Sequence, residues 1–394
     1  MVEKKFYGER LRTARMYRGM TLTELAKRTE ISKQSLSLYE NGNNTPDHKK
    51  VTLLSKELRF PYDYFFQKDN YIAKTETTYF RSLASANKKD RIAQSIKLEY
   101  VARMYEILLE YISFPTMNLP IVNFEGYDDV FECESIKATQ EIEDIATTVR
   151  EYWGIGTGPV RDLQYLLEKN GIIITGVDTG ENKIDAFSQR TIVSGSDIYF
   201  IAVVLGNRPE GRIRFDMAHE LGHILLHPWS EDLEAITKEE FKARERQANM
   251  FASAFLLPKN SFSKDISAYP TDLQYYQFLK KKWKVSIQAM IYRTHQLKII
   301  TDNQYQYLMR QVSKNGWRMK EPGDKPYILS ESIFQGAVDL LVEQNVLKAN
   351  DILKLLKRDG VTLYARDIEE LLNLRPNTLQ VDEKVVSILQ LRKK

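Results

Sequence analysis

The chain has only one cysteine and no long apolar run. Its single cysteine, Cys133, excludes an intrachain disulfide and a cysteine-based zinc site. No apolar run approaches the length that a membrane-spanning helix needs. Residues 1–5 lead directly into a helical pattern, without the apolar core of a secretory signal. We therefore expect a cytoplasmic protein that does not bind membranes.

The composition is otherwise that of an ordinary globular protein, with 43% hydrophobic and 28% charged residues. A length of 394 residues predicts two or three domains. The charge is unevenly distributed. Residues 1–60 carry 13 Lys or Arg and 7 Asp or Glu, a net charge of +6, whereas the rest of the chain has a net charge of −2. This asymmetry predicts that the N-terminal end meets the phosphates of a nucleic acid.

Histidine is also scarce, yet two of the five histidines stand close together in the segment His219-Glu220-Leu221-Gly222-His223. Residues four apart share one face of a helix, so both imidazoles can bind the same metal ion. Glu220 is placed to reach a metal-bound water molecule rather than the metal. The spacing therefore indicates a zinc site with a base beside it.

The alternative interpretation is a surface helix whose two histidines are solvated. The flanking residues argue against it, because they make the helix apolar nearly all round: Phe215, Met217, Ala218, Leu221, Ile224, Leu225 and Leu226. Such a helix is buried, and buried histidines need partners. We therefore expect both histidines to bind the metal.

A catalytic zinc site needs a third protein ligand and one position left for water. The next predicted helix, residues 238–257, offers three carboxylates: Glu239, Glu240 and Glu245. Only Glu245 shares its face with the small residues Ala248 and Ala252, which let the two helices approach closely. Glu245 is therefore the predicted third ligand. The alternative is a solvated glutamate between two arginines.

Residues 212–227 and 245–258 together resemble the ImmA/IrrE family of zinc-dependent metallopeptidases, which are similar to small gluzincins. The resemblance covers roughly residues 136–317. It implies an endopeptidase that hydrolyses a peptide bond in a regulatory protein, either a repressor or an antitoxin-like target.

The resemblance also assigns roles to single residues. It implies that His219, His223 and Glu245 bind Zn²⁺ and that Glu220 is the catalytic base, which assists the attack of zinc-bound water. No second catalytic acid or oxyanion donor is evident from the motif. Four residues have a suitable side chain, although residues of these types more often belong to the core or the surface: His227, Tyr275, Tyr276 and His295.

A different function stays open at this point. His227 lies four residues after His223, so a fourth zinc ligand and a closed, structural site are conceivable. The chain would then be a transcription factor or antitoxin-like regulator whose zinc site is structural or senses a ligand, without proteolysis. The presence of Glu220 favours the peptidase, because a structural site does not need a base.

The N-terminal end carries a second motif within a run of five short predicted helices, residues 5–66. Residues 21–46 resemble the Cro/repressor-type (XRE) helix-turn-helix domains, because their apolar side chains fall where that fold places its core: Leu25, Ala26, Ile31, Leu36 and Tyr39. The resemblance implies that the helix over 32–40 enters the major groove of DNA.

Polar side chains gather at the start of this predicted recognition helix. Lys33 and Gln34 are placed to reach base edges. Further candidates for DNA contacts are Ser35, Ser37 and Leu38 beside the bases, and Asn41 and Asn43 at phosphates. The sequence departs from the family at Leu22, where a phosphate-binding glutamine often stands. The alternative is a helical domain that binds protein, which the net charge of +6 disfavours.

The predicted fold is mainly α, α+β, in four segments. They are a five-helix helix-turn-helix DNA-binding domain (1–68), a helical connector (69–134), a small gluzincin-like metallopeptidase domain with a short sheet (135–320) and a C-terminal helical region (321–394). We expect operator DNA, a regulatory protein and a second copy of the chain as partners, because half-site readers usually act as dimers.

Some elements within these segments are predicted individually. The connector holds a long helix over 91–112, and Phe80-Arg81-Ser82-Leu83 resembles the connector of related regulators. Residues 125–134 read as a linker. Strands are expected near 172–175 and 194–205, and the second of these is placed to bind a substrate as an added strand.

Overall fold

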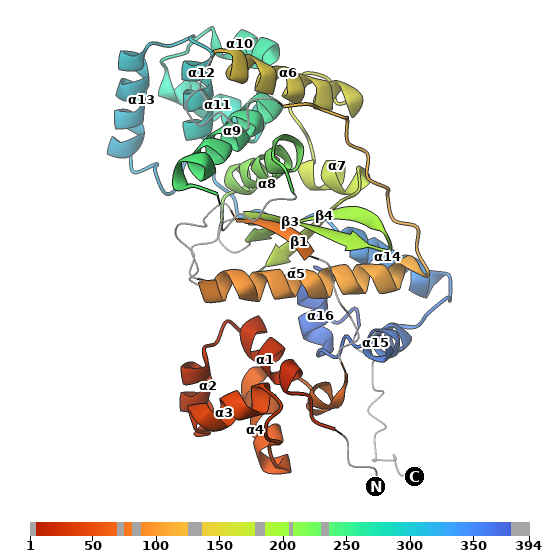
Figure 1. Ribbon diagram of the computed structural model, residues 1–394. Helices are drawn as coiled ribbons and strands as arrows, with labels where there is room; N and C mark the ends of the chain where they lie inside the picture. The colour runs from red at the N-terminus through yellow and green to blue at the C-terminus, as the bar shows by residue number, and fades with distance from the viewer. Residues whose placement is uncertain are drawn as a thin grey trace, which may run out of the picture. The chain divides into compact units, whose positions relative to one another are not determined.

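The computed structural model describes residues 5–68, 75–80, 88–124, 136–177, 186–204, 208–229 and 236–379. Within these ranges the chain is mainly helical with one small sheet, so the predicted fold class is confirmed (Figure 1). The predicted linker at 125–134 lies outside the described residues, as does most of the Phe80–Leu83 motif. Among the described helices, none combines the length and the apolar character needed to cross a bilayer.

The chain divides into two compact units that interleave in sequence. Unit 1 comprises residues 1–72, 100–113 and 331–394, and unit 2 comprises residues 73–99 and 114–330. Each unit has its own buried core.

Unit 1 begins with the five short elements that the sequence predicts. They are α1 (Gly8–Tyr17), α2 (Leu22–Thr29), α3 (Lys33–Glu40), α4 (His48–Leu58) and the 3₁₀ helix η1 (Tyr62–Phe66). Side-chain caps start three of them. Thr21 and Glu24 form a capping box at α2, Ser32 accepts the Ser35 N–H at α3, and Asp47 accepts the Lys50 N–H at α4. Local hydrogen bonding therefore sets the boundaries of the helix-turn-helix.

The C-terminal helices belong to the same unit. They are α14 (Ile333–Glu343), α15 (Ala349–Arg358) and α16 (Ala365–Leu371). Arg18 of α1 contacts Asp367 of α16 at 3.1 Å, and Arg10 donates to the carbonyl oxygen of Gly360 at 3.4 Å. The C-terminal region, to which the sequence assigns no role, thus packs on the first helix of the helix-turn-helix.

Unit 2 contains a four-stranded sheet in the order β1-β3-β4-β2. The strands are β1 (Thr75–Phe80), β2 (Ile172–Val177), β3 (Ala186–Val193) and β4 (Ser196–Val204). β3 pairs antiparallel with both β1 and β4, whereas β2 runs parallel to β4. β2 and β4 match the predicted strands, and β1 and β3 are additional. Because β4 is paired on both sides, the prediction that it binds a substrate as an added strand is wrong.

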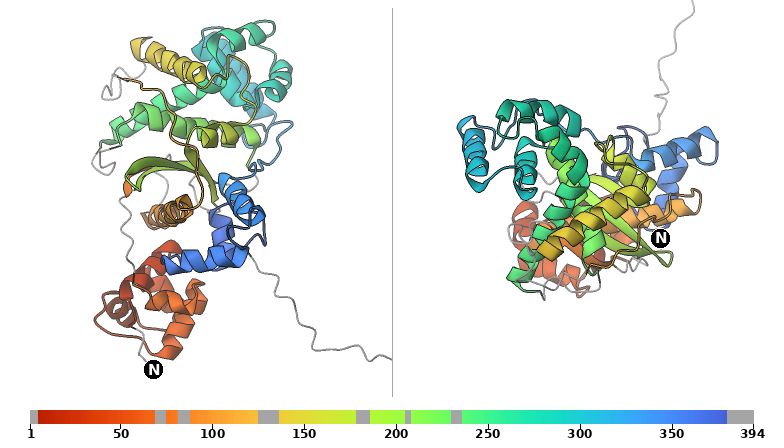
Figure 2. Two further views of the ribbon diagram at one scale, coloured as in Figure 1. Left: turned by 90° about the vertical axis from the view of Figure 1, so that its right-hand side faces the viewer. Right: turned by 90° about the horizontal axis from the view of Figure 1, so that it is seen from above.

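Helices cover both faces of this sheet (Figures 1 and 2). The helices of unit 2 are α6 (Ile136–Tyr152), α7 (Leu163–Lys169), α8 (Glu210–Leu226), α9 (Lys238–Leu256), α10 (Lys259–Ile266), α11 (Leu273–Trp283), α12 (Ile287–Gln296) and α13 (Asp302–Lys314). α8 packs on β3 and β4, and α9 packs on α8 from the other side. The first half of α5 (Lys88–Leu109) contacts the opposite face of the sheet, where the Ser95 hydroxyl donates to the Gln189 side chain at 3.4 Å.

Two helix boundaries differ from the predicted ones. α5 ends at Leu109, three residues before the predicted end and well ahead of Pro115. The sequence also predicts a helix over 160–169, but α7 begins at Leu163, because the Asp162 carboxylate accepts the Tyr165 N–H at 3.0 Å and acts as the N-cap. A capping side chain in this case sets the boundary more strongly than apolar spacing.

The helix α8 is buried along almost its whole length, as its apolar residues predict, with Ile213, Met217 and Leu221 fully covered. Its contact with α9 is very close at Gly222. A Cβ added to Gly222 would lie 3.2 Å from the Cα and the carbonyl oxygen of Ala248 and 3.2 Å from the ring of Phe251. The absence of a side chain at Gly222 and the small side chain of Ala248 therefore set the distance between the two helices.

We expect Gly222→Leu to destabilise unit 2 by about 1–3 kcal/mol, because the new side chain must enter space that Ala248 and Phe251 already fill. Urea unfolding of the purified chain measures this loss. Gly336→Leu on the exposed face of α14 is the matched control, since nothing lies within 4 Å of its added Cβ. Equal unfolding midpoints for the two variants would contradict the proposed role of the Gly222 contact.

Candidate metal centre and DNA-binding helix

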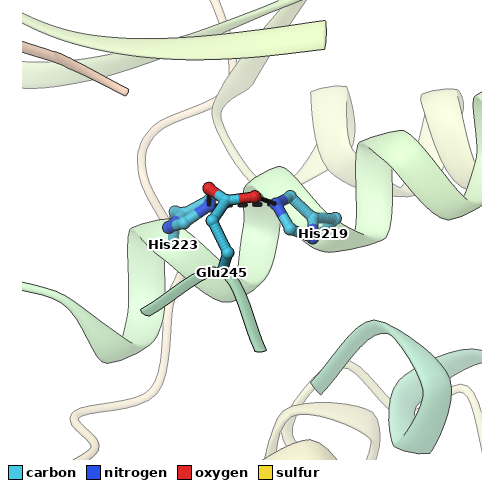
Figure 3. A group of neighbouring side chains, drawn as sticks. All are labelled: His219, His223 and Glu245. Atoms are coloured by element: carbon cyan, nitrogen blue, oxygen red, sulfur yellow. Dashed lines mark hydrogen bonds and ion pairs between the residues drawn. The ribbon is translucent and has the colours of Figure 1, made fainter. Parts of the chain in front are cut away.

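The three predicted ligands converge between α8 and α9 (Figure 3). The Nε2 atoms of His219 and His223 lie 3.0 Å apart. Glu245 reaches across from α9, with Oε2 at 3.4 Å from His219 Nε2 and Oε1 at 3.2 Å from His223 Nε2. His219 and His223 are 0% and 1% exposed, and the Glu245 side chain is 17% exposed. Within the described residues, no fourth His, Cys, Asp or Glu joins this cluster.

The spacing of these atoms fits a small metal ion. Zinc binds nitrogen and carboxylate oxygen at about 2.0–2.2 Å in a tetrahedral arrangement, which places neighbouring ligand atoms about 3.3–3.5 Å apart. The three observed separations of 3.0, 3.2 and 3.4 Å form one face of a tetrahedron of nearly this size. Two histidines and one carboxylate are also a donor set that zinc accepts at sites with an open fourth position.

Hydrogen bonding fixes the orientation of the first imidazole. His219 Nδ1 lies 3.1 Å from the side-chain oxygen of Asn249. An amide oxygen only accepts hydrogen bonds, so Nδ1 must carry the proton. The lone pair of His219 then lies on Nε2, which faces the cluster. Asn249 is on α9, so the helix that supplies Glu245 also orients His219.

A relay of two residues orients the second imidazole. His223 Nδ1 lies 2.9 Å from His227 Nδ1, and His227 Nε2 lies 3.0 Å from the side-chain oxygen of Gln247. Because the Gln247 oxygen accepts, His227 donates from Nε2 and accepts at Nδ1, so His223 donates from Nδ1. Its Nε2 lone pair also faces the cluster.

The electrostatics of His227 agree with this arrangement. Burial, followed by the neighbouring His223, lowers the pKa of His227 well below its usual value, so its ring is neutral. Its Nδ1 contacts His223 at Nδ1, the nitrogen that faces away from the cluster, and its Nε2 contacts Gln247. The structure therefore places His227 behind His223, in the position of a supporting residue, and does not bring it to the cluster as a fourth ligand.

Glu245 is ionised in this setting. Burial alone would raise its pKa, but hydrogen bonds and positive charge from His219 and His223, when these imidazoles are protonated at Nε2, outweigh that effect and hold the pKa of the carboxyl well below its usual range. With both imidazoles neutral, a bound cation would take the place of this positive charge between the two nitrogen atoms and the carboxylate. Such an arrangement is electrostatically complementary to a cation.

Glu220 lies on α8 next to His219 and is fully buried. The Ser188 hydroxyl of β3 donates to Glu220 Oε2 at 2.5 Å, and Ser188 is also fully buried. A hydrogen bond to the ionised form stabilises a carboxylate. The base predicted from the motif is therefore held at the junction of α8 and the sheet.

The other sequence candidates have partners outside the cluster. The hydroxyls of Tyr275 and Tyr276 donate to the carbonyl oxygens of Asp265 and Pro270, both at 2.8 Å, and His295 pairs with Asp302. Of the carboxylates at the start of α9, Glu240 pairs with Arg244 at 2.6 Å and Glu239 is exposed. Of these candidates, only Glu245 is brought to the two histidines.

Three residues around the centre were not identified from the sequence: Ser188, Asn249 and Gln247. The signal for the first was present, because Ser194-Gly195 separates two runs with strand character and forms a tight turn with positive φ at both residues (48° and 81°). That hairpin would have placed Ser188 on a strand beside β4. For Asn249 the signal was its position four residues after Glu245, on the same helix face. The sequence holds no comparable signal for Gln247.

In unit 1, α3 exposes the predicted DNA-contact residues to different degrees. Lys33, Gln34, Leu38, Asn41 and Asn43 are exposed, whereas Ser35 and Ser37 are half-buried.

Two contacts hold this helix in place. Arg15 of α1 donates to both carboxylate oxygens of Glu40 at 2.6 and 2.9 Å, and Glu40 is buried at the end of α3. The Asn41 side chain accepts from Arg12 at 2.6 Å. Lys33 and Gln34, at the N-terminal end of α3, are thus exposed on a helix that these contacts hold in place.

Comparison with known proteins agrees with both parts of this description. Residues 168–295 match the family described as the IrrE N-terminal-like domain, a peptidase family, and residues 8–71 match a helix-turn-helix domain family. No curated protein matches the chain. Both resemblances found in the sequence are confirmed. The chain therefore joins an XRE-type helix-turn-helix domain, which binds DNA, to a metallopeptidase-like domain of the ImmA/IrrE type.

Proposed function

We propose that the chain is a DNA-binding transcriptional regulator whose unit 2 hydrolyses a peptide bond in a regulatory protein. His219, His223 and Glu245 hold Zn²⁺, and Glu220 is the catalytic base. One observation carries this proposal: two Nε2 lone pairs and an ionised carboxylate converge at zinc spacing directly beside a buried glutamate. The match of this segment to a peptidase family supports it.

Each group has a defined part in the reaction. When bound, zinc supplies Lewis acidity, which acidifies a water molecule and polarises a carbonyl group. Glu220 accepts a proton from the attacking water at its carboxylate and delivers it to the amine nitrogen of the leaving peptide. Ser188 stabilises the ionised form of Glu220 before that transfer. Asn249 and the His227–Gln247 pair keep both histidine ligands in the tautomer that binds.

The second candidate function is a regulator whose metal site is structural or senses a ligand. Structural zinc sites usually have four protein ligands. The described residues bring three together, and His227 is engaged with His223 and Gln247 instead. A buried carboxylate beside the metal also has no purpose at a purely structural site. These features favour the peptidase.

In this proposal, unit 1 recognises the DNA sequence of the operator. α3 lies in the major groove, Lys33 and Gln34 read base edges, and Ser35, Ser37 and Leu38 lie near the bases. Asn41 and Asn43 bind the backbone. The chain acts as a homodimer on two half-sites of an operator.

The proposed function is tested by Glu220→Gln, which keeps the size of the side chain and an oxygen that accepts from Ser188 but removes the base. In cells, we expect one regulatory protein to accumulate only in this variant, because loss of a general base slows turnover by about 10²–10⁴-fold. Quantitative mass spectrometry of the cellular proteins measures this. Glu239→Gln, at the exposed start of α9, is the matched control. Identical protein levels in all three strains would overturn the peptidase proposal.

Loss of a supporting hydrogen bond should weaken metal binding without touching a ligand. We expect Asn249→Leu to lower zinc affinity by about 10–100-fold, because His219 loses the acceptor that fixes its tautomer. Asn249→Asp retains an acceptor oxygen and should stay within a few fold of wild type. Competition with a chromophoric chelator measures both. Equal affinities for the Leu and Asp variants would show that this hydrogen bond does not orient His219.

If Gln34 contacts base edges, its removal should lower the affinity for the operator but not for unrelated DNA. We expect Gln34→Ala to weaken binding to a selected operator by about 1–3 kcal/mol and to leave binding to unrelated duplex DNA unchanged. The operator is obtained by selection from random duplexes, and affinities are measured by gel shift. Gln306→Ala, an exposed glutamine of α13, serves as the control. If Gln34→Ala binds the operator as tightly as the control, Gln34 does not read bases.

A further inference from the structure

The edge of the sheet in unit 2 is occupied by a strand from a distant part of the sequence. β1 precedes α5, yet it pairs antiparallel with β3, which lies more than 100 residues further along the chain. β3 is bound on its other side by β4. Without β1, β3 would be the edge strand of the sheet, and its outer backbone groups would be open to another extended chain.

This edge lies next to the proposed base. Ser188 of β3 holds Glu220 with a hydrogen bond of 2.5 Å, and the residue of β1 in register with Ser188 is Tyr79. Neighbouring strands are about 4.8 Å apart. The backbone of β1 at Tyr79 therefore runs one strand spacing from the residue that contacts Glu220. An extended polypeptide bound at this edge would have its backbone in the same place.

Burial of the centre points to the same conclusion. His219, Glu220 and His223 are 0%, 0% and 1% exposed. A polypeptide substrate must bring its backbone to these residues, so the proposed function requires that part of the chain moves to admit it. β1 is suited to leave, because it is only six residues long, lies at the edge of the sheet and has an irregular register between Thr75 and Thr77.

We infer that the outer edge of β3 is the docking edge for an extended segment of the protein substrate, and that residues 75–80 occupy it as an intramolecular competitor. The inference rests on the proposed function and adds how its substrate is admitted. Backbone hydrogen bonds to β3 give the binding, as in other cases of strand addition. The apparent affinity for substrate is reduced by the fraction of molecules in which β1 is docked.

The direct test is to release β1 and supply its sequence in trans. Thr77→Pro/Thr78→Pro removes two consecutive backbone N–H groups, of which one points toward β3, because successive residues of a strand alternate in direction. The matched control, Thr77→Val/Thr78→Val, keeps both N–H groups and strand propensity. The probe is a fluorescein-labelled peptide with the sequence of residues 75–80, Thr-Glu-Thr-Thr-Tyr-Phe, and binding is followed by fluorescence anisotropy.

We expect the double-proline variant of the full chain to bind this peptide at least about tenfold more tightly than wild type and the valine control. Equal binding by the three proteins, or binding by none, would overturn the inference. Zinc affinity is measured in parallel and should match wild type, which verifies that unit 2 of the proline variant is folded.

A second variant keeps the test decisive if the prolines disturb folding. Thr77→Cys/Arg190→Cys, in a Cys133→Ser background, places two cysteines at paired positions of β1 and β3. Paired strand residues have Cα atoms about 4.5–5.5 Å apart, within the range of a disulfide. Oxidation should abolish peptide binding and reduction should restore it. Unchanged binding on oxidation would show that the peptide does not use this edge.

The experiments distinguish failure of the docking-edge inference from failure of the peptidase proposal. Peptide binding requires neither zinc nor turnover. Tight binding by the proline variant, together with no effect of Glu220→Gln in cells, would retain the docking edge and reject the peptidase. A target that accumulates with Glu220→Gln, together with equal peptide binding by all variants, would retain the peptidase and reject the docking edge.

Discussion

The close contact between α8 and α9 is the constraint on which the proposed metal centre depends. At Gly222 the two backbones approach until a single Cβ would press on Ala248 and Phe251. Ala248 lies one helical turn after Glu245, so the same contact that closes the gap between the helices brings the carboxylate to both imidazoles. α9 also supplies Asn249 and Gln247, which determine the tautomers of the histidines. A displacement of α9 would therefore disturb the third ligand and the orientation of the other two together.

The same contact links packing to chemistry. Burial of the centre raises the free-energy cost of an unpaired charge, and here hydrogen bonds orient both imidazoles and one carboxylate oxygen of Glu220. The neutral His227 donates to Gln247 and accepts from His223, which leaves the Nε2 lone pair of His223 facing the cluster. Ser188 donates to Glu220, which stabilises the ionised carboxylate. These hydrogen bonds orient the side chains of the proposed centre before any substrate binds, as the proposed catalysis requires.

Much of this centre could be predicted from the sequence, because it depends on local periodicity. The i, i+4 spacing of His219 and His223 and the small residue Ala248 after Glu245 are helical patterns, and the structure has helices there. The supporting residues could not be predicted in the same way. Asn249 lies four residues after Glu245 and shares its face, but whether its side-chain oxygen meets His219 depends on side-chain rotamers, which the sequence does not specify. β1 pairs with β3 across more than 100 residues of sequence, and the sequence does not specify this long-range partner.

The most direct measurement is a crystal structure of the zinc-loaded chain with anomalous scattering recorded at the zinc absorption edge. The account predicts a single strong anomalous peak within unit 2, bounded by His219, His223 and Glu245, with His227 still bonded to Gln247. A peak at another location, or a zinc ion that takes His227 as a ligand in place of Glu245, would contradict it.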